Sequence, residues 1–169
     1  MTTRVATGDD VEAIRQVAER AWEADYPDVL TRETAETAVT DWYDPGRLAT
    51  EIGRARTLVL VGERDGVVVG FSHGTWNYDA REGYILRMYV HPDHRRAGIG
   101  RELLERTCVE LAGQGVERVN AMVLAENEPG NAFYEHFGFE CADQHETTIG
   151  DAAYRENRYV LDVPRDDPD

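Results

Sequence analysis

The stretch from Tyr84 to Leu111 constrains the fold most, because it predicts a strand, a loop and a helix in immediate succession. Residues 84–90 read YILRMYV, a run of β-branched and aromatic residues that is typical of a strand. After the loop, apolar residues recur at helical spacing and charged residues fill the opposite face. The apolar positions are Ile99, Leu103, Leu104, Cys108 and Leu111. We expect the rest of the chain to be organised around this unit.

The start of this helix lacks the residues that normally cap one. Ser, Thr, Asp or Asn usually accepts hydrogen bonds from the free N–H groups there, but this loop ends in RRAGIG. An uncapped helix start is positively biased and is a ready site for an anion. Gly98 and Gly100 allow close approach to the backbone, and Arg95 and Arg96 add charge. We expect a pyrophosphate bound by N–H groups of roughly residues 96–101.

The glycine pattern taken alone is a weak sign of phosphate binding. Glycine-rich turns between a strand and a helix also occur simply because the two elements pack closely. Two other phosphate motifs are absent from the sequence. The P-loop pattern G-x-x-x-x-G-K-[ST] needs a lysine, and the chain has none. The dinucleotide pattern G-x-G-x-x-G is also missing.

A length of 169 residues is typical of one domain. We place that domain at residues 1–163, and we expect the charged segment 164–169 to fray. No apolar run approaches the roughly 20 residues of a membrane span, and the first residues show no signal-peptide pattern. We therefore expect a cytoplasmic protein without a membrane partner. Cys108 and Cys141 form neither a disulfide framework nor a zinc motif, so both should be reduced.

The charge balance is strongly acidic. Asp and Glu total 33, Lys and Arg total 18 with no lysine among them, and the formal net charge is −15. Such a surface repels nucleic acid and anionic membranes, so no nucleic-acid partner is expected. Acid enrichment with lysine depletion favours a halophilic protein, because high salt screens the self-repulsion. Attraction of a cationic substrate is a second, compatible explanation.

The remaining pattern predicts an α/β domain with a mixed central sheet of about six to seven strands flanked by helices. Asp9 and Glu12 give a capping-box-like helix start. Three strands at 57–62, 67–78 and 84–90 should be antiparallel neighbours, whereas a helical crossover makes 84–90 and 116–124 parallel. The other expected elements are a strand from Val5, helices to about Asp25 and over 31–42, 45–55 and 125–137, and strands over 139–147 and 153–163.

The second dense stretch reads NEPGNAFYEHFGF over residues 127–139. Its phenylalanines can serve a hydrophobic core, and Asn127 can cap a helix that follows it. Tyr134 can be an interface aromatic with a wet hydroxyl, or it can be a catalytic phenol. The residues alone leave both roles of Tyr134 open.

Together the two stretches resemble the GCN5-related N-acetyltransferase (GNAT) family. The family's V-x-P and [QR]-x-x-G-x-[GA] patterns match Val90, Pro92, Arg95, Gly98 and Gly100. Its later N-x-x-A-x-x-x-Y-x-x-x-G-F pattern matches Asn127, Tyr134, Gly138 and Phe139. Gly130 stands where alanine is usual, which predicts a looser or shifted helix start. The resemblance covers residues 56–163.

The resemblance implies transfer of an acetyl group from acetyl-CoA to a primary amine, directly in a ternary complex. The pantetheine arm would pair with residues 88–90 like an extra strand, and a backbone N–H near Val90 would polarise the thioester carbonyl. Tyr134 would donate a proton to the departing thiolate, which a phenol pKa of about 10 permits. The implied cofactor-binding residues are Met88, Tyr89, Val90, Arg95, Arg96, Ala97, Gly98, Ile99, Gly100, Arg101 and Asn127.

The general base and the acceptor pocket are less determined. The family often uses a carboxylate near the central strand, and Glu82 is the candidate by position. Tyr84, His73 and backbone carbonyls compete with it. The family builds its acceptor pocket from the first helices and the closing strands, although about half of the aromatic residues there can be core. The substrate-binding candidates are Trp22, Tyr26 and Trp76, with Trp42, Tyr43 and Tyr78 beside them.

The identity of the acceptor stays open. An aromatic, acidic pocket suits a cationic amine, and the candidates are peptide N-termini, lysine side chains, polyamines and aminoglycosides. No metal is expected, because His91 and His94 have no Glu or Cys to complete a ligand set. A non-catalytic acyl-CoA sensor and a structural or dimerisation domain are the alternatives, and a homodimer is compatible with all three.

Overall fold

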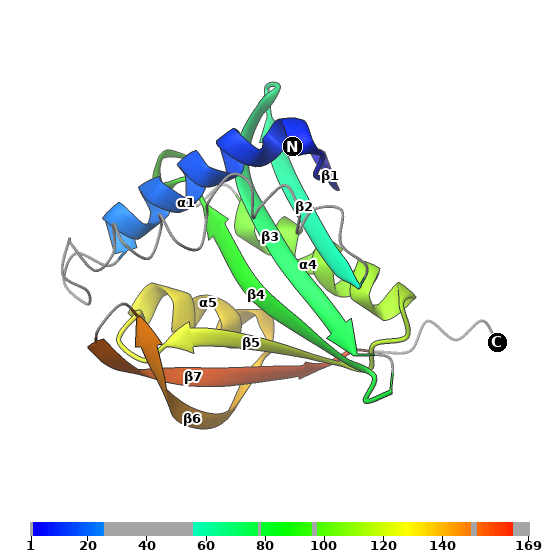
Figure 1. The fold of residues 1–169 in the computed structure, drawn as a ribbon, viewed down its shortest axis with the longest axis vertical. Helices are drawn as coiled ribbons and strands as arrows, with labels where there is room; N and C mark the ends of the chain where they lie inside the picture. Colours follow the sequence, from blue (N-terminus) through cyan, green and yellow to red (C-terminus); the bar gives the residue numbers. More distant parts are fainter. Residues whose placement is uncertain (1, 26–55, 78, 96–97, 150–151, 164–169) are drawn as a thin grey trace.

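The structure is a computed structural model that describes residues 2–25, 56–77, 79–95, 98–149 and 152–163. The helices predicted over 31–42 and 45–55 lie outside these residues. Within them, seven strands form one mixed sheet in the order β1-β2-β3-β4-β5-β7-β6 (Figure 1). The strands are β1 (Thr2–Val5), β2 (Thr57–Arg64), β3 (Val67–Asn77), β4 (Glu82–Val90), β5 (Arg118–Leu124), β6 (Glu140–Ile149) and β7 (Ala152–Asp162).

The pairing of the strands confirms the predicted topology. β2, β3 and β4 are antiparallel neighbours, and β4 and β5 run parallel. The other described pairs are antiparallel. The parallel pair is joined by a helix, as a connection between parallel strands requires.

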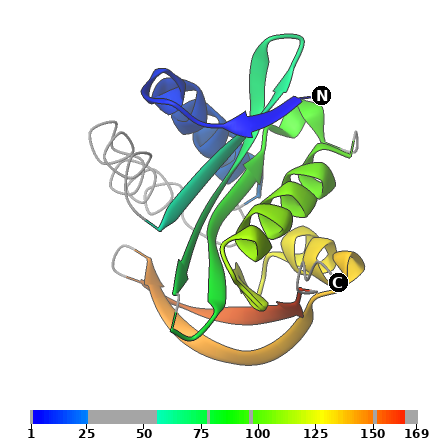
Figure 2. The same ribbon diagram turned by 90° about the vertical axis from the view of Figure 1, so that its right-hand side faces the viewer.

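Helices cover both faces of the sheet. The helical elements in the described ranges are η1 (Gly8–Asp10), α1 (Val11–Asp25), η2 (Pro92–His94), α4 (Ile99–Gly113) and α5 (Glu128–Phe137). α1 packs on one face, and α4 and α5 pack on the other (Figure 2). Alternate residues of β2 serve the two cores, since Val59 and Val61 lie with α1 while Leu60 lies with α4. None of these helices combines the length and the apolar character that a bilayer-spanning helix needs.

Two boundaries near the N-terminus differ from the expectation. β1 ends at Val5, where the sequence predicts that a strand begins. The first helical turn is held by Asp10 rather than Asp9, because the Asp10 carboxylate accepts the backbone N–H of Thr7 at 2.8 Å. Arg4 donates to the same carboxylate at 2.8 Å and lowers the pKa of Asp10. An ion pair between separate elements therefore fixes this start, and a local pattern does not reveal such a contact.

β4 and β5 are paired over only part of their length. The parallel register runs from Glu82 opposite Arg118 to Ile85 opposite Ala121, whereas β4 continues to Val90. Beyond Ile85 the two strands diverge (Figure 1). The end of β4 therefore has a partner on one side, β3, and an unpaired edge on the other.

A β-bulge marks the point of divergence. His73 is paired with Arg87 and Gly74 with Ile85, so Leu86 has no partner on β3. Its side chain is 50% exposed, which is unusual for leucine in a central strand. Bulges bend a strand and end regular pairing. The bulge at Leu86 thus turns β4 away from β5.

Candidate active site

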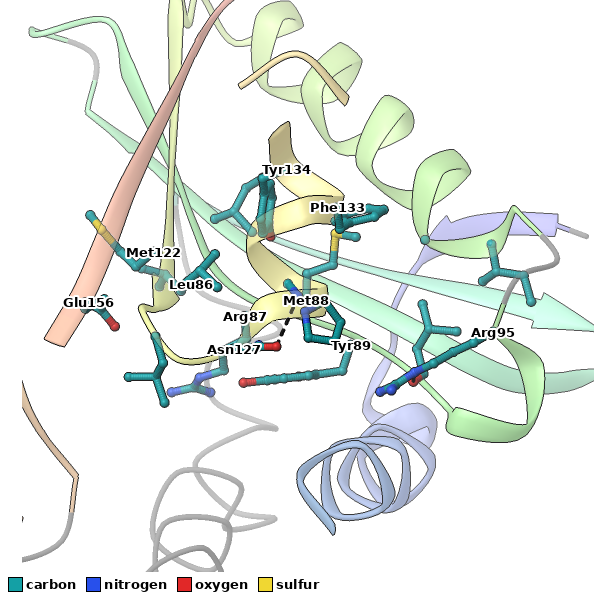
Figure 3. Close-up of a pocket in the computed structure, with 18 of the residues that line it drawn as sticks. Leu86, Arg87, Met88, Tyr89, Arg95, Met122, Asn127, Phe133, Tyr134 and Glu156 are labelled. Atoms are coloured by element: carbon teal, nitrogen blue, oxygen red, sulfur yellow. Dashed lines mark hydrogen bonds between the residues drawn. The ribbon is translucent and has the colours of Figure 1, made fainter. Parts of the chain in front are cut away.

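The space between the diverging strands is a cavity of about 840 Å³. Its walls come from β4, β5, the start of α4 and the start of α5, with contributions from β6 and β7. Figure 3 shows the side chains around it, with Arg95 and Glu156 at opposite ends. The predicted residues that line it are Met88, Tyr89, Val90, Arg95, Gly98, Ile99, Gly100, Asn127 and Tyr134.

The free edge of β4 presents backbone groups to this cavity. The backbone N–H of His91 donates to the carbonyl of Val69 on β3 at 2.8 Å. Backbone groups alternate direction along an antiparallel strand, so those of Met88 and Val90 point away from β3. The Val90 carbonyl accepts from Arg95 Nε at 3.2 Å, which fits this direction. The edge can therefore pair with an extended, amide-containing ligand.

The start of α4 forms the end of the cavity beside Arg95. Gly98 precedes the helix with φ 78°, a left-handed conformation that favours glycine. The first helical hydrogen bond joins the Glu102 N–H to the Gly98 carbonyl at 3.0 Å. The N–H groups of residues 99–101 therefore have no acceptor within the helix. Because the capping residue is glycine, these donors are available to an anion, as the sequence predicts.

Close packing, as well as access of a ligand to the backbone, requires glycine at position 100. A Cβ there would lie 3.3 Å from Phe133 Cε2 and 3.5 Å from Val90 Cγ2. Both neighbouring residues line the cavity. A side chain at this position would press on the wall that joins α4, β4 and α5.

Asn127 caps α5. Its side-chain oxygen accepts the N–H of Gly130 at 3.1 Å, and α5 begins at Glu128 rather than at Ala125. The start is therefore shifted, as one of the two expectations for Gly130 has it. A Cβ at Gly130 would lie 2.6 Å from Asn127 Nδ2, so glycine is what permits this position of the amide. Asn127 thus has a structural role while its side chain also lines the cavity.

Tyr134 is held by aromatic packing. Its side chain is only 7% exposed, and its ring stacks on Tyr159 with centroids 6.1 Å apart and an interplanar angle of 19°. Phe133 and Phe139 contact the same ring edge to face at 5.3 Å and 5.2 Å. A phenol fixed in this way at a cavity wall is suited to donate its proton in one direction.

Glu82 lies at the paired end of β4 and is not among the residues that line the cavity. Its carboxylate accepts from the Tyr84 hydroxyl at 3.2 Å and lies 3.9 Å from Arg118 Nη1. Burial, followed by Glu82, raises the pKa of Tyr84, so this phenol is a poor base near neutral pH. His73 is buried in β3 and is likewise absent from the cavity wall. The roles assigned to Glu82 and its competitors stay predictions.

Other predicted residues lie elsewhere or outside the described structure. The Arg101 side chain pairs with Glu105 at 3.2 Å, so only its backbone belongs to the open helix turn. Trp76 packs against the core around Leu111 and is not among the cavity residues. The structure does not describe the side chain of Trp22. It also does not describe the positions of Tyr26, Trp42, Tyr43, Tyr78, Arg96 and Ala97.

Sequence reasoning missed several residues that the fold brings to the site. Glu156 of β7, Thr147 of β6 and Met122 of β5 line the cavity, far in sequence from both motifs. Asn131 anchors the loop before α5, since its Nδ2 donates to the carbonyls of Leu124 at 3.0 Å and of residue 127 at 2.6 Å. Asn131 lies within the second motif, and a polar residue near a helix start is the sequence signal that could have identified it.

The comparisons identify the family. The Acetyltransferase (GNAT) family model matches residues 11–139. Acetyltransferase SG1711 of Sodalis glossinidius is 31% identical over 120 residues, which are 70% of this chain and 83% of that protein. Spermidine N(1)-acetyltransferase of Thermoplasma acidophilum is 26% identical over 139 residues, 80% of this chain and 85% of that protein. The chain therefore belongs to the acetyltransferase (GNAT) family.

Solved structures agree with this fold. The PaiA N-acetyltransferase of Thermoplasma acidophilum, solved in complex with coenzyme A, superposes with a TM-score of 0.85 at 23% identity and covers 96% of this chain and 98% of its own. The ribosomal-protein-S18-alanine N-acetyltransferase of Escherichia coli gives a TM-score of 0.69 at 22% identity, covering 96% and 93%. Family membership defines the class as acetyl-CoA-dependent N-acetyltransferases, and the solved structures agree with its fold.

Proposed function

We propose that the protein transfers an acetyl group from acetyl-CoA to a primary amine by direct attack in a ternary complex. The observation that carries this proposal is one cavity that joins three groups of different chemistry. They are the open N–H groups at the start of α4, the free edge of β4, and the fixed phenol of Tyr134. Acetyl-CoA needs these three groups in this order. The N–H groups suit its diphosphate, the strand edge suits its pantetheine amides, and the phenol suits its thioester.

Each group has a defined task in the proposed reaction. The N–H groups of residues 99–101 and the guanidinium of Arg95 bind the diphosphate, because a helix start and a cation both favour an anion. Met88 and Val90 pair with the amides of the pantetheine arm, and an N–H of this edge polarises the thioester carbonyl. Tyr134 protonates the thiolate as it leaves.

The acceptor is a primary amine on a peptide or on a small cationic molecule. A relative named as a spermidine N(1)-acetyltransferase supports the small cationic class. The net charge of −15 supports it further, because an acidic protein attracts cations to its surface. We also propose that the protein works in the cytoplasm of a halophile, as one domain over residues 1–163.

The test replaces the phenol of Tyr134. Tyr134→Phe should lower turnover about 10²-fold, the lower range for loss of a general acid, while the dissociation constant of acetyl-CoA stays within about twofold of wild type. Thiol release from acetyl-CoA with a panel of amines, in molar KCl, measures turnover, and titration calorimetry measures cofactor binding. Tyr154→Phe is the matched control, since Tyr154 lies on β7 outside the cavity.

A non-catalytic acyl-CoA sensor gives a different result. Such a protein would bind acetyl-CoA but release no thiol with any amine, and Tyr134→Phe would change nothing. A structural domain would not bind acetyl-CoA at all. Unchanged turnover in an active Tyr134→Phe variant would assign the proton donor to another group.

A further inference from the structure

Glu156 stands apart from the other polar residues of the cavity. Among the described residues that line it, Glu156 is the only carboxylate. Its side chain is 21% exposed, so it is partly withdrawn from water. Arg95 and the start of α4 lie at the opposite end (Figure 3). The cavity therefore has its carboxylate at the end remote from Arg95 and the open helix start.

The position of Glu156 is fixed by its strand neighbours. On β5 it lies opposite Leu124, and on β6 it lies opposite His145. The Nε2 atom of His145 is 2.9 Å from Glu156 Oε1, and the other ring nitrogen is 3.7 Å from Asp143. His145 is 42% exposed, so the pair connects the cavity to solvent.

We infer that Glu156 receives the ammonium group of the acceptor and removes its proton, and that His145 positions Glu156 and passes the proton to solvent. This inference rests on the proposed function. It assigns the acceptor group as a primary ammonium. It also gives the role of base to Glu156 instead of Glu82, which lies outside the cavity wall. Glu156 is thereby a catalytic residue, and His145 is a positioning residue.

The proton and electron balance is complete without a further reactant. An ammonium of pKa about 10 has no lone pair at neutral pH. Glu156 takes one proton, and the neutral nitrogen attacks the thioester carbon to form a C–N bond. Collapse breaks the C–S bond, and Tyr134 protonates the leaving thiolate. The nitrogen loses its second proton to solvent, and Tyr134 regains one proton from solvent. The products are an amide, free CoA thiol and one released proton.

The charged groups around Glu156 come from three strands. β6 contributes Asp143 and His145, and β7 contributes Arg158, all on the face of the hairpin that carries Glu156, whereas Glu146 and Arg155 pair on the opposite face. β4 contributes Arg87, which lines the same cavity. Two of these are engaged with each other, since Arg158 binds Asp143 at 2.7 Å. The close contact of Glu156 is with His145 Nε2 at 2.9 Å, and the histidine tautomer decides which of the two atoms donates.

The experiment compares Glu156→Gln, His145→Gln and the control Glu146→Gln. Glu146 is exposed on the same hairpin and does not line the cavity, so its variant removes one charge without touching the site. Thiol release is measured with spermidine and with a short peptide that has a free N-terminus, from pH 6 to 10, in molar KCl. Acetyl-CoA binding is measured by calorimetry for each variant.

Glu156→Gln should lower kcat/KM for the amine about 10²-fold near neutral pH, the loss typical of a general base. The deficit should shrink toward pH 10, where the amine is already neutral; a purely structural role gives no such recovery. His145→Gln should lower kcat about tenfold with the same recovery. Acetyl-CoA affinity should stay within about twofold in every variant, as cofactor contacts lie at the other end.

Two results separate the possible failures. If the wild-type enzyme is active and Glu156→Gln has the rate and pH profile of Glu146→Gln, the inference about Glu156 is overturned and the proposed function stands. If the wild-type protein binds no acetyl-CoA, the proposed function falls, and the inference falls with it.

Discussion

The two glycines of α4 allow a direct test of the diphosphate site. Gly100 and Gly113 are both helical, but their surroundings differ. A Cβ at Gly100 meets Phe133 at 3.3 Å and Val90 at 3.5 Å, whereas a Cβ at Gly113 meets nothing within 4 Å. Replacement of each by alanine removes the same backbone freedom from the unfolded chain. Only Gly100→Ala alters the cavity wall.

The expected magnitudes follow from these contacts. Gly113→Ala should stabilise the protein by about 0.5–1 kcal/mol, the helix preference for alanine over glycine. Gly100→Ala should raise the free energy of unfolding little, because its methyl group presses on Phe133. It should also disturb one hydrogen bond from the helix start to the diphosphate, worth about 1.5–3 kcal/mol for a charged acceptor. Acetyl-CoA binding should weaken about 10- to 100-fold, since 1.4 kcal/mol is a factor of ten.

The assay is titration calorimetry with acetyl-CoA, paired with urea unfolding in the same buffer. Urea unfolding establishes that both variants are folded and gives the change in stability. Equal acetyl-CoA affinity of Gly100→Ala and Gly113→Ala would refute the assignment of the diphosphate to the start of α4. A loss shared by both variants would also refute it, because Gly113 is at the far end of the helix.

Three further predictions concern stability. Asn131→Ala should cost about 2–4 kcal/mol in urea unfolding, because it removes the hydrogen bonds of this side chain to two loop carbonyls and to the Tyr159 hydroxyl, although each of these groups keeps one other partner; an effect below 1 kcal/mol would contradict the anchoring role. Burial, then Glu135, raises the pKa of Tyr159 to about 12, so the folded protein keeps a proton that the unfolded chain loses above about 10. The free energy of unfolding should therefore fall between about pH 10 and 12, and Tyr159→Phe should reduce that slope. Because the net charge is −15, the free energy of unfolding should rise from low to molar KCl, and equal values would argue against a halophilic origin.

Local sequence patterns predicted most of the fold. The apolar stripe of α4 is buried as expected, from Ile99 at its start to Leu111 near its end. The structure adds Thr107 to that buried face, where its hydroxyl lies 2.7 Å from that of Ser72. A polar residue on an apolar stripe finds its partner only in the folded state. The pattern therefore omitted it.

Residues of the two motifs line one end of the cavity, and the residues at its other end come from strands outside the motifs. Residues of the turn before α4 and of the start of α5 line the cavity, because backbone conformation and capping depend on neighbours in sequence. Glu82 was chosen for its closeness to the central strand in sequence, but it lies on the paired end of β4. The direction in which β4 and β5 separate decides which carboxylate faces the cavity.

The sequence by itself determined the helix start that is open to an anion, since Gly98 supplies the left-handed turn and no side chain to close it. It also indicated the parallel pair around α4, because parallel neighbours need a crossover connection and one helix lies between these two strands. Only the tertiary structure decided that β4 parts from β5 at the Leu86 bulge and that Glu156 meets His145 beside the resulting cavity. Those contacts join strands that are distant along the chain, and sheet register, which local pattern does not encode, brings them together.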